Sequence, residues 1–303
     1  MATFARNLRQ FAKPGLALAG TATGMFMFSK NNQANSAASN VQIPDFTPVT
    51  VLSAETETSD VKRVTFALPD KTRPLGHEAI SAIMLKTQVG DTPVMKPYNP
   101  VGNKDGEFTL CVKKYSGAKM GSAVHRLVVG DTFLAKFGWQ QFPYKANQFK
   151  QIAAIAGGTG ATPLIQLTET IMANKDDKTK VTLIFANKTD ADIFYKQQLD
   201  VLTTKNPDRL KVVYAVEHAS ADFWDSLLVP SRGIIGRVTK EVIQDHVHSS
   251  SASDSLVLVC GPGEMLKSLS GPKLFPKGGA PQQGPLKGIL KDLGFSESNV
   301  FKV

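Results

Sequence analysis

Hydrophobic and polar positions alternate along residues 46–142 in short segments bounded by Gly, Pro, Asp and Asn. Such alternation, with frequent turn residues, predicts an antiparallel barrel or sandwich. The expected strands are Pro48–Leu52, Val61–Leu68, Ala82–Thr87, Glu107–Lys113 and Asp131–Phe137. One segment, Ser122–Val128, has the pattern of a helix.

After Lys150 the pattern changes to short apolar runs separated by helical segments. Strands are expected at Ile152–Ala156, Val181–Phe185, Leu210–Ala215 and Ser255–Val259, and helices at Pro163–Ala173, Asp190–Leu199, Thr239–Val247 and Leu286–Leu293. Apolar strands alternating with helices predict a parallel sheet with right-handed crossovers. The predicted fold class is therefore two-domain: an N-terminal antiparallel β-barrel, residues 41–146, and a C-terminal α/β parallel-sheet domain, residues 147–303.

A glycine turn follows the first apolar run of the second domain, in the sequence QIAAIAGGTGATPL from Gln151 to Leu164. Glycine lets the backbone turn sharply, and Thr162 is expected to cap a helix that begins at Pro163. A strand, a glycine turn and a helix N-terminus together suit a nucleotide or another anion. Counted from Gly158, a Rossmann fingerprint would end in glycine where this chain has Pro163, so an ordinary strand-to-helix turn remains the alternative.

Composition and charge narrow the class of protein. The chain has 303 residues, of which 42% are hydrophobic and 20% charged, as in a soluble globular protein of two domains. The formal net charge is +9, but the lysines beyond the first 40 residues are scattered. Nucleic-acid binding would require a basic stripe interleaved with aromatic side chains, so no nucleic-acid partner is expected.

Cysteine and histidine positions predict no metal site. Cys111 and Cys260 lack metal-site spacing, and the pair His246 and His248 lacks further ligands. Cys111 lies in an alternating apolar stretch and is expected in a core. Cys260 ends an apolar run directly before Gly261, at the end of an expected strand.

The first 40 residues have the composition of a targeting leader. They contain four basic residues and no Asp or Glu, with an apolar stretch at 14–28 and a Ser/Asn/Ala-rich linker at 29–40. Fifteen helical residues cover about 22 Å, less than the roughly 30 Å hydrocarbon core of a bilayer. We expect a mitochondrial leader with an apolar outer-membrane anchor or stop-transfer segment, with residence in the outer membrane or intermembrane space. A cleaved presequence and a secretory signal are the alternatives.

Four segments in a fixed order resemble those of a known family. They are Lys96-Pro97-Tyr98-Asn99-Pro100, Ala118-Lys119-Met120-Gly121, Gly157-Gly158-Thr159-Gly160-Ala161-Thr162-Pro163 and Cys260-Gly261-Pro262-Gly263-Glu264-Met265. Through them, residues 45–303 resemble the ferredoxin–NADP reductase superfamily and, within it, the NADH–cytochrome b5 reductases. With the leader, the chain is similar to the fungal mitochondrial form of that family. The resemblance implies that the barrel binds FAD and the α/β domain binds NADH.

The first motif corresponds to the family's Arg-x-Tyr-Thr, in which the arginine lies near the flavin phosphates, the tyrosine packs on the ring and the threonine bonds near the reactive nitrogen. Tyr98 matches, and Pro97 lies between the positions that contact flavin. Lys96 lacks the planar guanidinium that grips phosphate. Asn99 is expected to donate a hydrogen bond through its amide instead. A proline-rich turn without ligand contacts is the alternative.

The second motif corresponds to the family's Gly-Lys-Met-Ser, which meets the FAD pyrophosphate at a helix N-terminus. Gly121 replaces the serine, and Ser122 is expected to substitute as the helix cap. The implied flavin contacts are Lys119, Met120, Gly121, Ser122, Val112 and Lys113. A buried strand position is the alternative for Val112.

The last two motifs, with a segment after the second parallel strand, imply the nicotinamide half of the site. Its residues are Gly157, Gly158, Thr159, Gly160, Pro163, Asp192, Cys260, Gly261, Pro262 and Met265. The resemblance implies that Thr162 contacts the flavin from this second domain, and that the glycines of the turn let the cofactors approach. By resemblance Asp192 lies near the adenine ribose, which favours NADH over NADPH; the alternative is that it complements a helix dipole. Cys260 is expected to position the nicotinamide, and Met265 has a core position as its alternative.

The resemblance implies an enzyme in which NADH reduces FAD and the flavin passes electrons singly to a haem protein. The expected acceptor is an acidic haem protein such as cytochrome b5. Asn99, Thr162 and Cys260 are the residues implied at the reacting centre. A quinone or another acceptor is one alternative. A flavin-free, non-catalytic anchored protein is the other, because Lys96, Asn99 and Gly121 depart from the family pattern.

Overall fold

A computed structural model describes residues 46–71, 80–227, 231–247, 254–277 and 280–303, all of which belong to one compact unit of the chain. The predicted leader, residues 1–40, lies outside the described residues, and so does its apolar segment 14–28. Among the helices that are described, none is long and apolar enough to cross a membrane.

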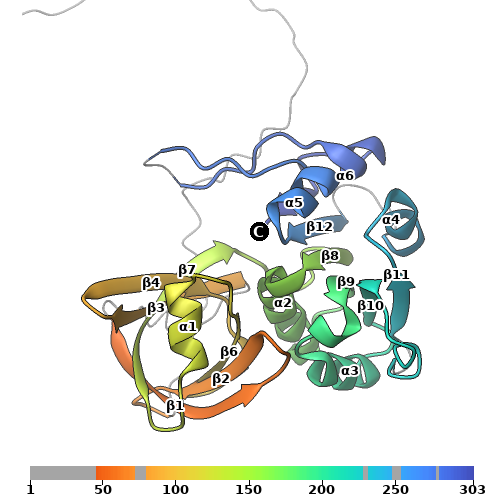
Figure 1. The fold of residues 1–303 in the computed structure, drawn as a ribbon. Helices are drawn as coiled ribbons and strands as arrows, with labels where there is room; N and C mark the ends of the chain where they lie inside the picture. Colours follow the sequence, from red (N-terminus) through yellow and green to blue (C-terminus); the bar gives the residue numbers. More distant parts are fainter. Residues whose placement is uncertain (1–45, 72–79, 228–230, 248–253, 278–279) are drawn as a thin grey trace, which may run out of the picture. The chain divides into compact units, whose positions relative to one another are not determined.

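The first domain is a seven-stranded antiparallel sheet with the strand order β4-β3-β7-β1-β2-β6-β5 (Figure 1). Its elements are β1 (Thr47–Thr56), β2 (Val61–Ala67), β3 (Ile80–Val89), β4 (Thr92–Tyr98), β5 (Val101–Lys104), β6 (Glu107–Lys113), α1 (Lys119–His125) and β7 (Thr132–Phe142). Alternate side chains point into one core, where Phe66 and Phe108 stack with ring centroids 5.1 Å apart. The predicted antiparallel barrel domain is confirmed.

The second domain is a six-stranded parallel sheet with the order β11-β10-β9-β8-β12-β13. Its strands are β8 (Gln151–Gly157), β9 (Lys180–Thr189), β10 (Leu210–His218), β11 (Arg232–Ile235), β12 (Ser255–Cys260) and β13 (Val300–Lys302). Its helices are α2 (Ala161–Ala173), α3 (Lys196–Lys205), α4 (Lys240–His246), α5 (Gly263–Leu269) and α6 (Gly288–Asp292), with 3-10 turns at Gly158–Gly160 and Asp190–Asp192.

Helices cover both faces of this sheet. Alternate residues of β8 belong to two cores: Ile152 packs with α2 and α3, and Ile155 packs with α4, α5 and α6. The strand order reverses between β8 and β12, so the turns that follow these two strands lie side by side at the carboxyl edge. A reversal of this kind is where open α/β sheets bind ligands.

Several predicted element bounds were wrong. The barrel helix begins at Lys119, not at Ser122. The helix expected from Asp190 begins only at Lys196, because Tyr195 has the left-handed φ of 59° and ends the preceding turn. The alternation of hydrophobic and polar positions does not reveal strand β4, because it contains two prolines, which an edge strand tolerates.

Candidate functional site

The glycine turn after β8 packs directly on the turn after β12. Cys260 pairs with Ala156 in the last register position of these strands. A Cβ atom on Gly160 would lie 2.6 Å from the carbonyl oxygen of Cys260, and one on Gly157 would lie 2.5 Å from Met265 Sδ. The backbone of the second turn therefore already requires glycine at position 160, whatever ligand approaches it, whereas the atom nearest a Cβ at Gly157 is the end of the flexible Met265 side chain. Met265 packs partly buried against the core that includes Leu269, as its alternative interpretation held.

The start of α2 differs from the expected capping pattern. The helix begins at Ala161 with Gly160 as its N-cap, and no side chain caps it. Thr162 is buried within the first turn, where its hydroxyl donates to the carbonyl of Thr159 at 3.0 Å. The prediction that Thr162 caps a helix starting at Pro163 was therefore wrong. Thr159 itself faces the barrel domain, since its hydroxyl lies 3.3 Å from that of Tyr115.

Cys260 is a partly buried thiol at the reversal of strand order. Burial raises its pKa to about 11, and the positive charge of Lys273 opposes part of that rise. The group is therefore a neutral thiol at physiological pH, which suits positioning and not nucleophilic attack. Cys111 is buried in a core, as predicted, and burial raises its pKa as well.

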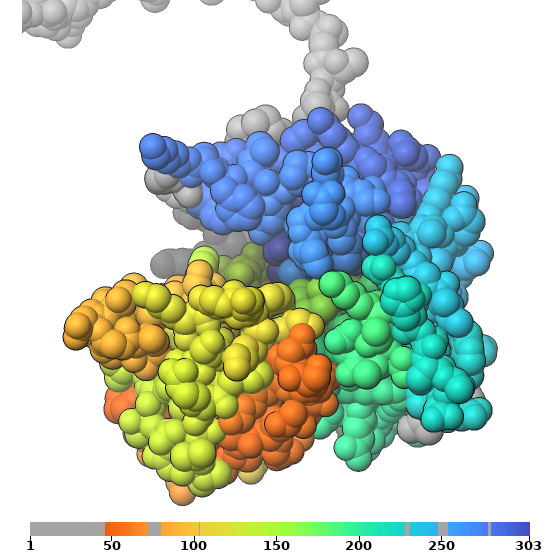
Figure 2. Space-filling view, viewed as in Figure 1, coloured from red at the N-terminus to blue at the C-terminus, as the bar shows by residue number. Residues whose placement is uncertain are grey.

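Lys273 belongs to a loop that is held beside Cys260 by a buried lysine. We call Gly271–Gly284 the strap. Lys302, only 2% exposed, lies next to Val259 in the β12–β13 register. Its Nζ atom donates to the carbonyls of Pro272, Gln283, Gly284 and Pro285 at 2.6–3.3 Å. In Figure 2 the surface is hollowed between the blue segment that includes the strap and the yellow surface of the barrel.

The first barrel motif forms the end of β4 and the residue after it. Lys96 and Pro97 are exposed, and Lys96 has no ion pair among the described residues. Tyr98 is half-buried against the barrel core, and burial raises the pKa of its phenol to about 12, so it stays protonated. The motif thus offers a free cation and a fixed aromatic ring within three residues.

Asn99 is hydrogen-bonded to three other elements. Its Nδ2 atom donates to Gln141 Oε1 at 2.6 Å, to the carbonyl of Ser81 at 3.1 Å and, more weakly, to Gln166 Oε1 at 3.5 Å. The two amide hydrogens are used within the protein. The expectation that Asn99 donates through its amide to a ligand is wrong for this arrangement.

The second barrel motif lies at the start of α1. Ala118 is the N-cap and has no capping side chain, and Ser122 lies a turn inside the helix, so the prediction that Ser122 caps it was wrong. Gly121 packs on strand β6, since a Cβ atom there would lie 3.1 Å from the carbonyl of Lys113. The larger serine of the family pattern would need this neighbour to move. Lys119 is exposed and Met120 is buried.

Two expected contacts on β6 are used by the protein itself. Val112 is 1% exposed and belongs to the barrel core, as its alternative held, and its carbonyl lies 2.8 Å from His125 Nε2. Lys113 forms an ion pair with Asp60 at 2.7 Å. A ligand could therefore meet only the backbone of Val112, or Lys113 in competition with Asp60.

Acidic side chains lie just beyond the end of β9 and near the end of β10. Asp192 accepts hydrogen bonds from the backbone N–H and the hydroxyl of Thr189. The first of these belongs to a capping box, in which the Thr189 side chain also accepts from the backbone N–H of Asp192. The role of Asp192 near a ribose stays a prediction. Glu217, the penultimate residue of β10, pairs with Arg237 at 3.3 Å and was missed. Its place at the carboxyl edge of the third parallel strand was the signal that could have identified it.

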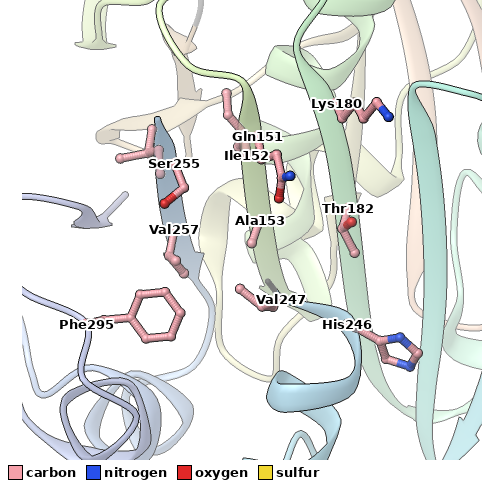
Figure 3. A pocket seen from close by; sticks show the side chains of 11 residues that line it. Gln151, Ile152, Ala153, Lys180, Thr182, His246, Val247, Ser255, Val257 and Phe295 are labelled. Carbon is pink, nitrogen blue, oxygen red and sulfur yellow. The ribbon is translucent and has the colours of Figure 1, made fainter. Parts of the chain in front are cut away.

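A cavity of about 200 Å³ lies at the opposite edge of the same sheet (Figure 3). Residues at the starts of β8, β9 and β12 line it, together with His246 and Phe295. Because ligands of parallel sheets bind at the carboxyl ends of the strands, this cavity is not part of the candidate site. No cluster of metal-ligating side chains is found among the described residues; His248 lies outside them.

Comparisons with known proteins give both domains a family. Residues 48–144 match the oxidoreductase FAD-binding domain and residues 154–270 match the oxidoreductase NAD-binding domain. The chain is 40% identical over 249 residues to NADH-cytochrome b5 reductase 2 of Candida albicans, covering 81% of this chain and 78% of that protein. It is 39% identical to the protein of the same name from Saccharomyces cerevisiae strain YJM789, covering 82% and 80%.

The fold agrees with this assignment. The cytochrome b5 reductase domain of Ulva prolifera nitrate reductase superposes with a TM-score of 0.70 at 24% identity, over 86% of this chain and 98% of that domain. The flavin motif of the barrel, the glycine turn and the cysteine turn occur in the order that the resemblance requires. The chain belongs to the NADH-cytochrome b5 reductase family.

Proposed function

We propose that this protein is an NADH-dependent flavoenzyme that passes electrons through FAD to a one-electron haem acceptor, cytochrome b5. One observation supports this most strongly. Helix α2 starts at the glycine turn of the NAD-binding domain, and one turn later its Gln166 lies 3.5 Å from Asn99, next to Tyr98 of the flavin motif. A single helix thus joins the two halves that such a reaction must bring together.

The residues present fit a flavin dinucleotide. Lys96 and Lys119 are exposed cations without an ion pair in the described part of the chain, and each can meet a phosphate. The ring of Tyr98 is fixed by packing against the barrel core. Gln166 keeps a buried Nε2 atom that has no hydrogen-bond partner among the described residues. Orphaned buried donors are rare and are typical of sites that a ligand or water completes.

When bound, FAD supplies the capacity to accept a hydride and to release its electrons one at a time. The protein supplies alignment. The neutral thiol of Cys260 and the backbone of Gly261 give the nicotinamide a surface without competing charge, and the protonated phenol of Tyr98 does the same for the flavin. Hydride transfer requires no general base, so geometry is the main contribution of these residues.

The cofactor preference is proposed from charge. Asp192, beyond the end of β9, and Glu217, near the end of the adjacent β10, place carboxylates at the edge where the dinucleotide would lie. Carboxylates repel a 2′-phosphate and accept hydrogen bonds from a 2′-hydroxyl, so NADH is the expected donor. Arg237 offsets part of the charge of Glu217, so Asp192 is the first residue to test.

The acceptor is proposed from the relatives' names and from charge. The family members above are named for cytochrome b5, and this chain has a net charge of +9. Exposed lysines of the barrel that are not assigned to the flavin phosphates, such as Lys114 and Lys136, would attract an acidic haem protein, and salt would weaken that attraction. A quinone is the alternative acceptor.

A mitochondrial location is proposed on the composition of residues 1–40 alone, with segment 14–28 as an outer-membrane anchor. Fractionation of cells that express the full chain, followed by carbonate extraction, tests it. Recovery in the soluble cytosol would count against both the leader and the anchor.

Turnover of the purified full chain tests the function. We expect faster reduction of cytochrome b5 than of a soluble quinone, with NADH far better than NADPH, and a rate that falls as ionic strength rises. A rate that salt leaves unchanged would reject the proposed docking. Lys96→Arg should raise flavin occupancy because the guanidinium binds phosphate through two hydrogen bonds. A colourless protein that is inert with NADH and ferricyanide would support the flavin-free alternative.

A further inference from the structure

The orientation of the Asn99 amide is fixed by its surroundings. The carbonyl of Ser81 can only accept a hydrogen bond, so the Asn99 atom that lies 3.1 Å from it must be nitrogen. The second amide hydrogen points to Gln141 Oε1 at 2.6 Å. Asn99 Oδ1 has no partner among the described residues. Toward any ligand, therefore, Asn99 offers an acceptor and no donor.

Two glutamines hold this orientation from different elements. Gln166, on α2 and 1% exposed, accepts at Oε1 from the backbone N–H of Ser81 at 3.0 Å, so its amide orientation is fixed as well. Gln141 lies at an irregularity in β7, where Ile80 pairs with Phe142 but Ser81 pairs with Gln140. Gln141 is thus the extra residue of a β-bulge. Bulges redirect side chains and are frequent next to active sites.

We propose that Asn99 is a redox-tuning residue which accepts a hydrogen bond from N5–H of the reduced flavin, and that Gln141 and Gln166 are the positioning residues that restrict it to this role. The inference rests on the proposed function. Hydride transfer breaks the C4–H bond of NADH and forms the N5–H bond, which leaves NAD⁺ and reduced flavin, with both electrons on the flavin. N5 is an acceptor before this step and a donor after it.

An acceptor-only partner therefore favours the reduced flavin over the oxidised one. The hydroxyl of a threonine at this position can donate to N5 of the oxidised flavin or accept from N5–H of the reduced flavin, so it discriminates less. We expect the ratio of affinities for reduced and oxidised flavin to be about tenfold higher with Asn99 than with threonine. For a two-electron couple, tenfold corresponds to about 30 mV.

The test is the two-electron midpoint potential of the bound flavin in the full-chain holoenzyme. Asn99→Thr should lower it by about 30 mV, and Gln141→Leu should lower it in the same direction because it frees an amide hydrogen of Asn99 to face the flavin. Gln140→Leu is the matched control: the same residue type, adjacent and exposed, with no hydrogen bond to Asn99. It should leave the potential unchanged.

An unchanged or higher potential in Asn99→Thr overturns the inference. Asn99→Thr decides the question if Gln141→Leu does not fold, and flavin content and thermal unfolding are measured for each variant. An equal shift in Gln140→Leu also overturns it, because the effect would then be general to β7. A wild-type chain that binds no FAD, or whose flavin NADH does not reduce, rejects the proposed function itself. If NADH reduces the flavin normally but the midpoint potential is the same in the wild type and in Asn99→Thr, only the proposed role of Asn99 is rejected.

Discussion

The carboxylate of Glu169 accepts a hydrogen bond from the backbone N–H of Gly102 at 2.8 Å and so joins helix α2 to barrel strand β5. Its other oxygen accepts from the hydroxyl of Tyr195 at 2.8 Å. The backbone N–H of Tyr195 in turn donates to Glu57 Oε2, at the end of the β1–β2 hairpin, at 3.1 Å. Four residues, two from the α/β domain and two from the barrel, thus connect the two halves of the site independently of any ligand.

Gly102→Ala should destabilise this connection. Gly102 has φ +58°, and an added Cβ atom would lie 2.6 Å from Tyr195 Oη. We expect the free energy of unfolding to fall by about 2–4 kcal/mol from left-handed strain and overpacking together. Adding Tyr195→Phe removes the clashing oxygen.

A double-mutant cycle by urea denaturation measures this coupling. The double variant should lose at least about 1 kcal/mol less than the sum of the two single changes. If the stability losses of the two single changes simply add, backbone strain alone accounts for the stability cost of Gly102→Ala, and the contact with Tyr195 contributes nothing.

Glu169 should give the protein a pH-dependent stability. Burial raises the pKa of this carboxyl, so the native state binds its proton more tightly than the unfolded state does. Stability from this group is then greatest at acidic pH and falls as the pH rises from about 4.5 through the raised pKa. Glu169→Gln, which keeps the size and one acceptor, should remove this fall.

The measurement is the unfolding free energy of both proteins across pH 4–8. The advantage of Glu169→Gln over wild type should grow with pH and then level off. If the difference in unfolding free energy between the two proteins shrinks with rising pH, the hydrogen bonds from Gly102 and Tyr195 outweigh burial and lower the pKa of Glu169.

Lys302→Met should release the strap. The substitution keeps the volume but removes the ammonium that satisfies four backbone carbonyls, and buried acceptors without a partner cost about 1–3 kcal/mol. We expect lower stability and faster proteolysis within Gly271–Gly284. Lys287→Met provides a control for lysine removal nearby. Unaltered cleavage rates would show that Gln283, which also bonds the backbone of Lys302, holds the strap alone.

Lys273 should control the reactivity of the Cys260 thiol. Its charge lowers the Cys260 pKa, so Lys273→Met should raise that pKa above about 11. The rate of alkylation by iodoacetamide at pH 9 should then fall by a few-fold, since the thiolate is the reacting form. The exposed Lys277 on the same strap is the control, and Lys277→Met should have no effect. Equal rates in all three proteins would show that Lys273 does not act on the thiol.

The architecture was predictable because its signals are local. Short apolar runs separated by helices specify a parallel sheet, and the runs beginning at Ile152 and Ser255 were placed correctly in β8 and β12. The end of the first barrel strand was missed by several residues, since β1 continues to Thr56 through a polar, half-exposed stretch. The break at Tyr195 was missed because a left-handed φ at tyrosine leaves no sequence pattern.

The detailed chemistry of the site could not be predicted, because it depends on contacts between distant segments. Asn99 was expected to donate to a ligand through its amide, but its amide hydrogens are used by Ser81 and Gln141, 18 and 42 residues away. The glycines of the turn were expected to make room for cofactors, whereas Gly160 is required first by the carbonyl of Cys260. Each correction concerns a partner that only the folded chain supplies.

Anaerobic titration of the purified full chain with NADH tests the central claim most directly. We predict a yellow protein that contains FAD and whose oxidised-flavin absorbance is bleached by a stoichiometric amount of NADH within seconds, and far more slowly by NADPH. A flavin-containing protein that NADH does not bleach would contradict the account, and so would a protein that takes up no FAD when the cofactor is supplied in excess.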